Sequence, residues 1–190
     1  SYESGLFDHV ANKFLGFRKI VETRPSVPGE TVPAKIERTY RQDLASYGMV
    51  ELTDYKDAAG TVRKSVAETW TVNATTKPYT ALNTATRTVL TENITLATNV
   101  ERVFDAYANI LEVKDYGRVV PPGEPNAGTD ILGDTIWTVH DYVPNTAAYL
   151  VSALRSESVR DNLNTATDPL RHFVNTYDGQ ANDTDPPVRG

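Results

Sequence analysis

Histidine, cysteine and acidic side chains are the usual carriers of catalysis and metal binding, and this 190-residue chain has few of them in useful patterns. His9, His140 and His172 lie far apart, and none falls in the HExxH spacing that places two zinc ligands on one helical face. His140-Asp141 offers an acid–base or metal pair, but His beside Asp at the end of a strand is more often a surface pair. The absence of cysteine excludes disulfides, thiolate metal ligands and a cysteine nucleophile.

Phosphate-binding and nucleophile motifs are also missing from the sequence. It contains no GxGxxG, no GxxxxGK[ST] and no GxSxG pattern. Acidic residues are plentiful, but no two of them stand out as a general acid and a general base. We therefore predict that the protein is not an enzyme, uses no metal or other cofactor and has no small-molecule substrate.

One polar strand face remains as a candidate binding surface. Period-two alternation predicts a strand from Val62 to Asn73 and another over residues 86–97, each with one polar face. Hydroxyl, amide and guanidinium groups on a pleated face can contact phosphates and unpaired bases, although a solvated sheet face has the same composition. The candidate RNA-binding residues are Arg63, Ser65, Thr69, Thr71, Asn73, Arg87, Thr91, Asn93 and Thr95.

The elements that must position these residues predict the α+β class, with an antiparallel sheet over residues 35–97 covered on one face by helices. A bend at Gly48 and a hairpin loop at Asp57-Ala58-Ala59-Gly60 divide the first strands. On the strand from Val62, the face opposite the polar one carries Trp70, which we expect to lie beneath a helix. A change of Trp70 to Ala would then cost about 3–5 kcal/mol.

The predicted helices flank this sheet in the sequence. Helical spacing of apolar residues predicts a helix over 5–17, followed by a proline-containing arm to residue 34. Thr98-Asn99-Val100-Glu101 matches a capping box, and an apolar stripe continues to Leu111. Further helices are predicted over 145–155, 156–163 and 169–177, with one possible strand over 131–143. Residues 1–178 are thus read as a single domain without internal repeats, and 179–190 as a flexible tail.

Charge is unevenly distributed along the chain. The formal net charge is −6, with +1 over residues 1–98 and −7 over residues 99–190. A near-neutral first half could face a polyanion while the acidic second half faces solvent, although a random split gives the same pattern. No apolar run approaches the ~20 residues of a membrane helix, and no signal peptide is visible. Ser1 suggests a trimmed initiator methionine, so we expect synthesis in the bacterial cytoplasm and no membrane partner.

The element order resembles the coat proteins of single-stranded RNA bacteriophages, the levivirus-like family, over about Lys35 to Val113. The resemblance rests on a strand opening with Arg63-Lys64, a long polar loop, and a strand opening with Arg87 that leads into a helix with Glu101-Arg102 in its first turn. It implies a sheet lining a shell, helices on the outer side and an interlocked dimer. It would place the polar face toward RNA, and Val66, Trp70, Leu90 and Ile94 beneath the helices. The predicted N-terminal helix and the long C-terminal segment depart from the family pattern.

The leading functional hypothesis is a capsid protein that forms dimers, assembles into an icosahedral shell and packages single-stranded RNA, so that it resides in the virion. One alternative is another phage virion component, such as a tail or neck protein. The others are a non-viral binding module and an enzyme whose site carries no sequence motif.

Overall fold

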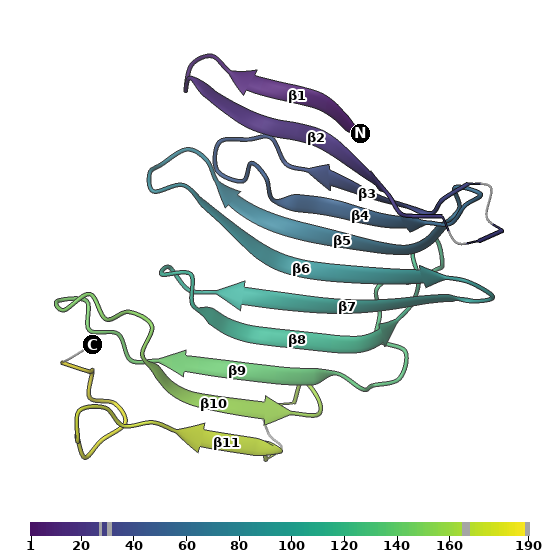
Figure 1. Ribbon diagram of the computed structural model, residues 1–190. Coiled ribbons are helices and arrows are strands. Elements are labelled where there is room, and N and C mark those ends of the chain that lie inside the picture. Colours follow the sequence, from purple (N-terminus) through teal and green to yellow (C-terminus); the bar gives the residue numbers. More distant parts are fainter. Residues whose placement is uncertain (27, 30–31, 165–167, 189–190) are drawn as a thin grey trace. The chain divides into compact units, whose positions relative to one another are not determined.

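The computed structural model describes residues 1–26, 28–29, 32–164 and 168–188. Within them the protein is all-β, with eleven strands in one sheet that follow the order of the sequence, and no helix (Figure 1). The predicted α+β class, a sheet covered by helices, is therefore wrong. The strands are β1 (Tyr2–Asp8), β2 (Lys13–Thr23), β3 (Lys35–Tyr40), β4 (Val50–Lys56), β5 (Val62–Asn73), β6 (Thr80–Thr91), β7 (Thr95–Phe104), β8 (Ile110–Val119), β9 (Ile136–Tyr142), β10 (Leu154–Arg160) and β11 (Arg171–Val174).

The chain divides into two compact units. Unit 1 comprises Ser1–Asn99 and Val120–Gly128, and unit 2 comprises Val100–Val119 and Thr129–Gly190, so β7 contributes residues to both. In unit 1, strands β1 to β6 pair antiparallel with their neighbours in sequence. In unit 2, strands β8 to β11 do the same. No helix in the described part of the chain is long and apolar enough to cross a membrane.

The N-terminal segment forms a β-hairpin where a helix was predicted over residues 5–17. Asp8 Oδ1 accepts hydrogen bonds from the amides of Val10 and Ala11, at 2.8 and 2.9 Å, and so closes the turn between β1 and β2. Gly16 has a φ of 90°, which lies in the left-handed region and is incompatible with a right-handed helix. The apolar spacing fits both structures, but these backbone conformations and the pairing of β1 with β2 favour the hairpin.

The segment predicted as a helix from Thr98 to Leu111 is also a hairpin, formed by β7, a tight turn and β8. Asp105 interrupts the apolar stripe, and its Oδ1 accepts hydrogen bonds from the amides of Tyr107 and Asn109, both at 2.8 Å. The capping-box match is therefore coincidental, because the threonine and the glutamate lie within a strand. Carboxylate-to-backbone bonds compete directly with helical bonding, which explains why the turn prevails.

The three predicted C-terminal helices are replaced by a loop and two strands. β10 lies between β9 and β11, and its register places Glu157 opposite His140 on one side and Phe173 on the other. Cross-strand ion pairs support this arrangement, since Arg155 pairs with Asp141 and Arg171 pairs with Glu157. These partners are distant in the sequence, so the local periodicity used to predict helices could not detect them.

Other sequence predictions are confirmed. The strand from Val62 to Asn73 is β5 with the same bounds, and the loop before it contains Gly60 at a φ of 83°. Gly48, at a φ of 78°, lies in the bend between β3 and β4. The possible strand over 131–143 is β9. The predicted arm and tail lie partly outside the described residues.

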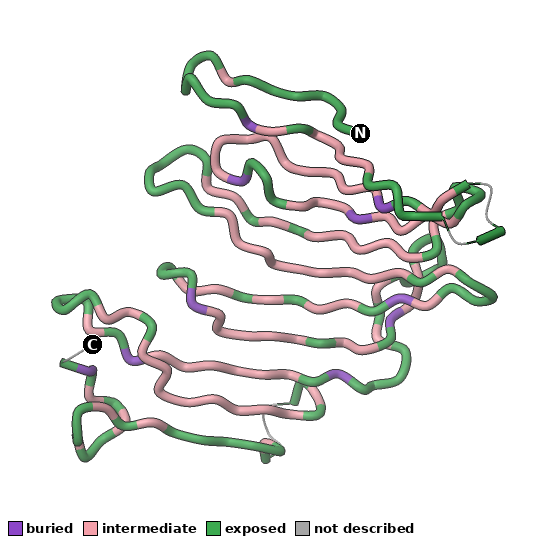
Figure 2. The backbone as a smooth tube through the Cα atoms, viewed as in Figure 1, coloured by how far each residue is buried: buried purple, intermediate pink, exposed green. Residues whose placement is uncertain are grey.

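Burial is sparse in both units, and most strand residues are half-buried (Figure 2). In the described part of the chain no helix covers the sheet. Large apolar side chains therefore remain exposed, including Phe14 in unit 1 and Val174 in unit 2, which are 49% and 47% exposed. The buried hydrophobic residues among those described are Leu15, Ile36, Ala97, Val119 and Val143.

Candidate functional site

The register of β5 and β6 places most of the predicted RNA-binding residues on one face of these two strands. Ser65 lies opposite Val89 and Ala67 lies opposite Arg87, and residues paired in this way share a face. Alternation along each strand then adds the remaining members of the set. The residues brought together are Arg63, Ser65, Thr69, Thr71, Asn73, Arg87 and Thr91.

The single strand predicted over residues 86–97 does not exist, so Asn93 and Thr95 do not belong to the two strands that carry this group. β6 ends at Thr91, a short turn follows, and Thr95 is the first residue of β7. Asn93 lies in the turn and both residues are exposed. Threonine-rich segments on either side of a short turn have the same composition as one continuous strand, so sequence alternation cannot locate the reversal.

The cations of the predicted face already have partners within the protein. The guanidinium of Arg63 pairs with Asp57 at 2.7 Å, and Arg87 Nη2 donates to the carbonyl of Val120 at 3.1 Å. The hydroxyl of Ser65 donates to Asp54 Oδ1 at 2.8 Å. These bonds use only part of the N–H donors of each guanidinium, and the buried Nε of Arg87 has no hydrogen-bond partner within the described residues.

Acidic side chains further balance the charge of this face. Glu37 lies opposite Asp54, which lies opposite Ser65. The two carboxylates therefore lie on the same face as Ser65, in one row of side chains across β3, β4 and β5. Glu37 accepts ion pairs from Lys56 at 2.7 Å and from Lys19 at 2.9 Å. The hydrogen bond from Lys56, followed by that from Lys19, holds the pKa of Glu37 below its usual range. The row is thus a compensated charge network and not a cationic track.

Trp70 does not occupy the predicted position beneath a helix. It is half-buried on β5, and its indole Nε1 donates to the carbonyl of Val50 at 2.8 Å. On the same face Glu68 accepts hydrogen bonds from Asn83 and Thr86, at 2.6 and 2.7 Å. Glu68, which interrupts the apolar residues of this face, is therefore hydrogen-bonded, and no helix in the described residues contributes to covering the face.

The histidine that sequence reasoning considered for chemistry does not pair with its neighbour. His140 Nε2 lies 3.4 Å from Glu157, whereas Asp141 pairs with Arg155. Adjacent residues of a strand point to opposite faces, which explains why the His140-Asp141 dipeptide makes no pair. In the described residues no group of three or more His, Cys, Asp and Glu side chains could hold a metal ion.

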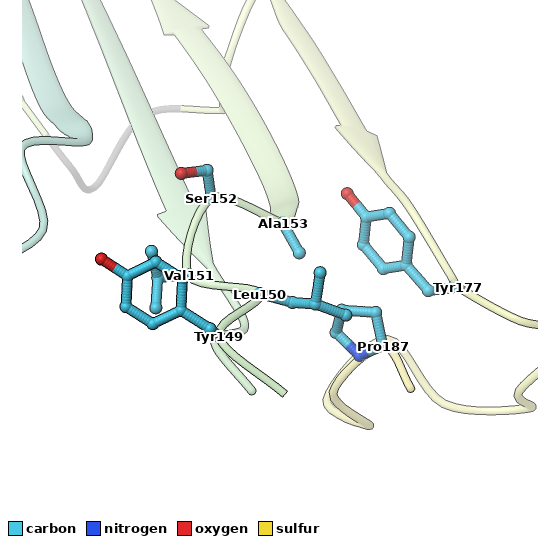
Figure 3. Close-up of a pocket in the computed structure, with 7 residues that line it drawn as sticks. All are labelled: Tyr149, Leu150, Val151, Ser152, Ala153, Tyr177 and Pro187. Atoms are coloured by element: carbon cyan, nitrogen blue, oxygen red, sulfur yellow. The ribbon is translucent and has the colours of Figure 1, made fainter. Parts of the chain in front are cut away.

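A hollow lies in unit 2, between the loop that precedes β10 and the chain that follows β11 (Figure 3). Its volume is about 590 Å³, within the range of ~300–1,000 Å³ typical of ligand sites. Tyr149 and Tyr177 lie on opposite sides, with Leu150 and Ala153 between them (Figure 3). The lining residues are Tyr149, Leu150, Val151, Ser152, Ala153, Tyr177 and Pro187.

Hydrogen bonds fix both walls of this hollow. Asn145 and Leu150 exchange backbone bonds of 2.8 and 2.9 Å, so that Tyr149 projects from a tight turn with a φ of 56°. The hydroxyl of Tyr177 donates to the carbonyl of Leu154 at 2.8 Å. The amide Nδ2 of Asn145 donates to the carbonyl of Pro187 at 2.8 Å, which attaches the C-terminal segment to the turn.

Sequence reasoning missed this hollow because it predicted a helix over 145–155 and a flexible tail from residue 179. The pair Pro144-Asn145 was an available turn signal. Proline is common in turns, and Asn side chains bond to the backbone a few residues ahead. No local pattern indicates that residues 149–153 meet Tyr177 and Pro187, which lie far along the chain.

Comparison with known proteins shows similarity of fold alone. No protein-family model matches the chain, and no curated protein matches it. The crystal structure of TcdB2-TccC3 without its hypervariable C-terminal region matches 83% of this chain with a TM-score of 0.60 and 12% identity. The structure of TcdB2-TccC3 matches with 0.58 and 12%, and that of TcdB2-TccC3-Cdc42 with 0.56 and 10%. In each case the match spans only 12% of the other chain, so this fold is similar to a small part of a much longer polypeptide.

Proposed function

We propose that the protein is a non-catalytic structural segment, a β-sheet whose apolar surfaces are covered by other polypeptide in a larger assembly. The observation that carries this proposal is the exposure of large apolar side chains along strands that no helix covers in the described residues. Leu6, Phe7 and Phe14 in unit 1 are more than 40% exposed, as are Ile136 and Val174 in unit 2. Exposed apolar patches of this kind mark interaction surfaces in stable proteins.

Further support comes from the edges and from the comparisons. Strand β1 bonds to β2 on one side, and β11 bonds to β10 on one side, so each leaves an edge that another strand can pair with. In the similar structures the part that matches this chain is about an eighth of the other chain's length. A sheet of this type can therefore serve as one section of a longer polypeptide.

Light scattering and dye binding on the purified protein test the proposal. We expect association above the 21.0-kDa mass of one chain, together with strong binding of the apolar dye ANS by any residual monomer. A monodisperse 21.0-kDa monomer at micromolar concentration that binds no ANS and unfolds cooperatively would contradict a structural role that depends on partners.

Packaging of RNA in a phage shell stays a prediction, and the same preparation can test it. Negative-stain microscopy would reveal uniform shells, and extraction would reveal any bound RNA. If RNA is bound, changing both Arg63 and Arg87 to alanine should lower the RNA content and the salt dependence of binding. Because both guanidinium groups have internal partners, this double variant needs a thermal unfolding control, since loss of the Arg87 bond to Val120 can also loosen unit 1.

A further inference from the structure

The hollow in unit 2 has a lining that selects against charge. Among its seven lining residues none is charged, and the polar groups are hydroxyls and backbone atoms. Transfer of an unpaired charge into such a lining is costly, so an uncharged ligand is favoured. The volume of about 590 Å³ is sufficient for a few apolar side chains and exceeds what a single water or ion would need.

One of the residues that line the hollow is a proline from the C-terminal segment of the chain itself. Pro187 is buried, and its carbonyl accepts the hydrogen bond from Asn145. The carbonyl of Pro186 accepts a second bond from Gln180 Nε2 at 3.0 Å. Proline-rich peptides dock in aromatic-lined apolar grooves, and Pro187 is itself one of the residues that line this hollow.

Two tyrosines complete the resemblance to an aromatic-lined groove. The Tyr177 ring is held by its hydroxyl bond to Leu154, so it forms a fixed wall. Tyr149 is 84% exposed at the tip of its turn, and its hydroxyl makes no hydrogen bond within the described residues. Leu150 lies between the two rings and forms an apolar base (Figure 3). An exposed aromatic ring above an apolar base leaves contact area and one hydroxyl available to a ligand.

We propose that this hollow binds an uncharged, proline-rich peptide in extended conformation from another polypeptide. A proline ring would pack on Leu150 and Ala153 between the two tyrosine rings, and the Tyr149 hydroxyl would donate to a peptide carbonyl. Polyproline conformation is preformed, so such a ligand loses little entropy on binding. This inference is independent of the proposed structural role, because binding to unit 2 does not require the sheet to be covered.

Fluorescence anisotropy with a labelled probe tests the proposal in monomers and in assemblies alike. The probe is fluorescein-labelled Pro-Pro-Leu-Pro-Pro amide, and the control peptide replaces each proline by glycine. We expect saturable binding of the proline probe with a Kd of about 1 mM or tighter, and at least about tenfold weaker binding of the glycine peptide. Absence of saturation with the proline probe, or equal binding of both peptides, would overturn the proposal.

A matched pair of tyrosine variants locates the binding. Tyr149→Ala should weaken binding of the proline probe about tenfold, since the ring contributes contact area and its hydroxyl a donor. Tyr107→Ala is the control, because Tyr107 is also exposed in a hairpin turn of unit 2 but does not line the hollow. Its Kd should stay within about twofold of the parent. Equal effects of the two substitutions would place the binding elsewhere and refute the assignment of this hollow.

Discussion

Two hairpin loops, Asp57–Thr61 in unit 1 and Asp105–Asn109 in unit 2, are built to the same plan. In each, the amide of the first residue donates to the carbonyl of the fifth, at 3.0 and 2.9 Å. The amide of the fourth residue donates back to the carbonyl of the first, at 2.9 and 3.2 Å. The aspartate Oδ1 accepts from the amide of the fifth residue, at 2.9 and 2.8 Å. The chain thus uses one turn design twice, although no internal repeat is apparent in its sequence.

The two loops differ at the position that requires a left-handed backbone. Gly60 has a φ of 83° in the first loop, and Ala108 has a φ of 67° in the second. The first loop was predicted from its glycine, whereas the second was interpreted as part of a helix. The comparison teaches that the aspartate and its backbone bonds define this turn, and that glycine only lowers its conformational cost.

The loops also differ in how they are attached to their surroundings. The second oxygen of Asp57 pairs with the exposed guanidinium of Arg63 at 2.7 Å. The second oxygen of Asp105 accepts from Asn109 Nδ2 at 2.8 Å, and Asn109, which is 9% exposed, also donates to the carbonyl of Val151 at 2.8 Å. The loop in unit 2 is therefore part of a buried tertiary network, and that in unit 1 is mainly a local structure.

The largest difference in stability between the two loops is expected when their aspartates are removed. Asp105→Ala should lower the free energy of unfolding by about 2–3 kcal/mol, because it removes the acceptor of two amides and one of the two acceptors of the buried Asn109 Nδ2. Asp57→Ala should cost clearly less than Asp105→Ala, because water can replace its exposed bonds. Urea unfolding of the two variants measures both values. Equal losses would show that the Asn109 network adds nothing to the second loop.

Exchanging the fourth residues should change stability in opposite directions. Ala108→Gly should stabilise the protein by up to about 1 kcal/mol, because the left-handed conformation disfavours a Cβ atom. Gly60→Ala should destabilise it by about 1 kcal/mol, for backbone reasons alone, since no atom lies within 4 Å of the added Cβ. Thermal melts of both variants provide the measurement. Destabilisation by Ala108→Gly would mean that the Ala108 methyl group makes a contact more important than the backbone strain.

Acid should weaken both loops less than removal of the carboxylates does. Partial burial acts to raise the pKa of Asp105, but hydrogen bonds from Asn109 and from the amides of Asn109 and Tyr107 outweigh it, so the pKa is lowered. The backbone bond from Thr61 is the main cause of the lowered pKa of Asp57. A carboxylate with a lowered pKa in the folded state contributes stability above its ordinary pKa of about 3.9, and this contribution is lost as the pH falls through the folded value.

Unfolding measured at about pH 6 and about pH 3 can isolate this contribution. Asp105→Asn retains an acceptor oxygen but does not titrate, so its loss of stability in acid should be smaller than that of the parent. Asp57→Asn should show a difference of the same sign. An Asp105→Asn variant as acid-sensitive as the parent would show that the carboxylate charge does not stabilise the second loop.

The smallest effect is expected from the exposed ion pair of the first loop. Arg63→Ala should cost no more than about 0.5 kcal/mol, because exposed ion pairs contribute little and are screened by salt. Comparison with Asp57→Ala then separates the ion pair from the backbone bonds of the aspartate. If Arg63→Ala costs as much as Asp57→Ala, the ion pair rather than the backbone pattern holds this loop.

Particular elements show why only part of the fold could be predicted. β5 was predicted with its correct bounds because valines, tryptophan and threonines alternate along it without a competing periodicity. The segment over 5–17 fits both a helix and a hairpin, because apolar residues flank its turn at spacings that suit either. Helical hydrogen bonds are local, whereas the backbone pairing of β1 is made with another strand, so a local pattern does not reveal this partner.

The candidate binding surfaces could also be predicted only in part. The polar face of β5 followed from alternation, but the internal partners of Arg63 and Arg87 did not, because Val120 lies 33 residues from Arg87. The hollow in unit 2 joins a turn at Tyr149 to Pro187, a contact between distant segments that no motif announces.

The sequence by itself determined the chemical inventory and several turns of this protein. It excluded cysteine chemistry, indicated threonine-rich strands and placed a bend at Gly48 and a hairpin loop at Gly60, because these properties depend on single residues and their neighbours. Only the tertiary structure decided that the ambiguous segments pair as strands and that Arg63 and Arg87 each bond to an oxygen within the protein. It also decided that two tyrosines enclose a hollow. The physical reason is that strand pairing and pocket formation depend on hydrogen bonds and contacts between residues far apart in the chain, and their free energy has no counterpart in local periodicity.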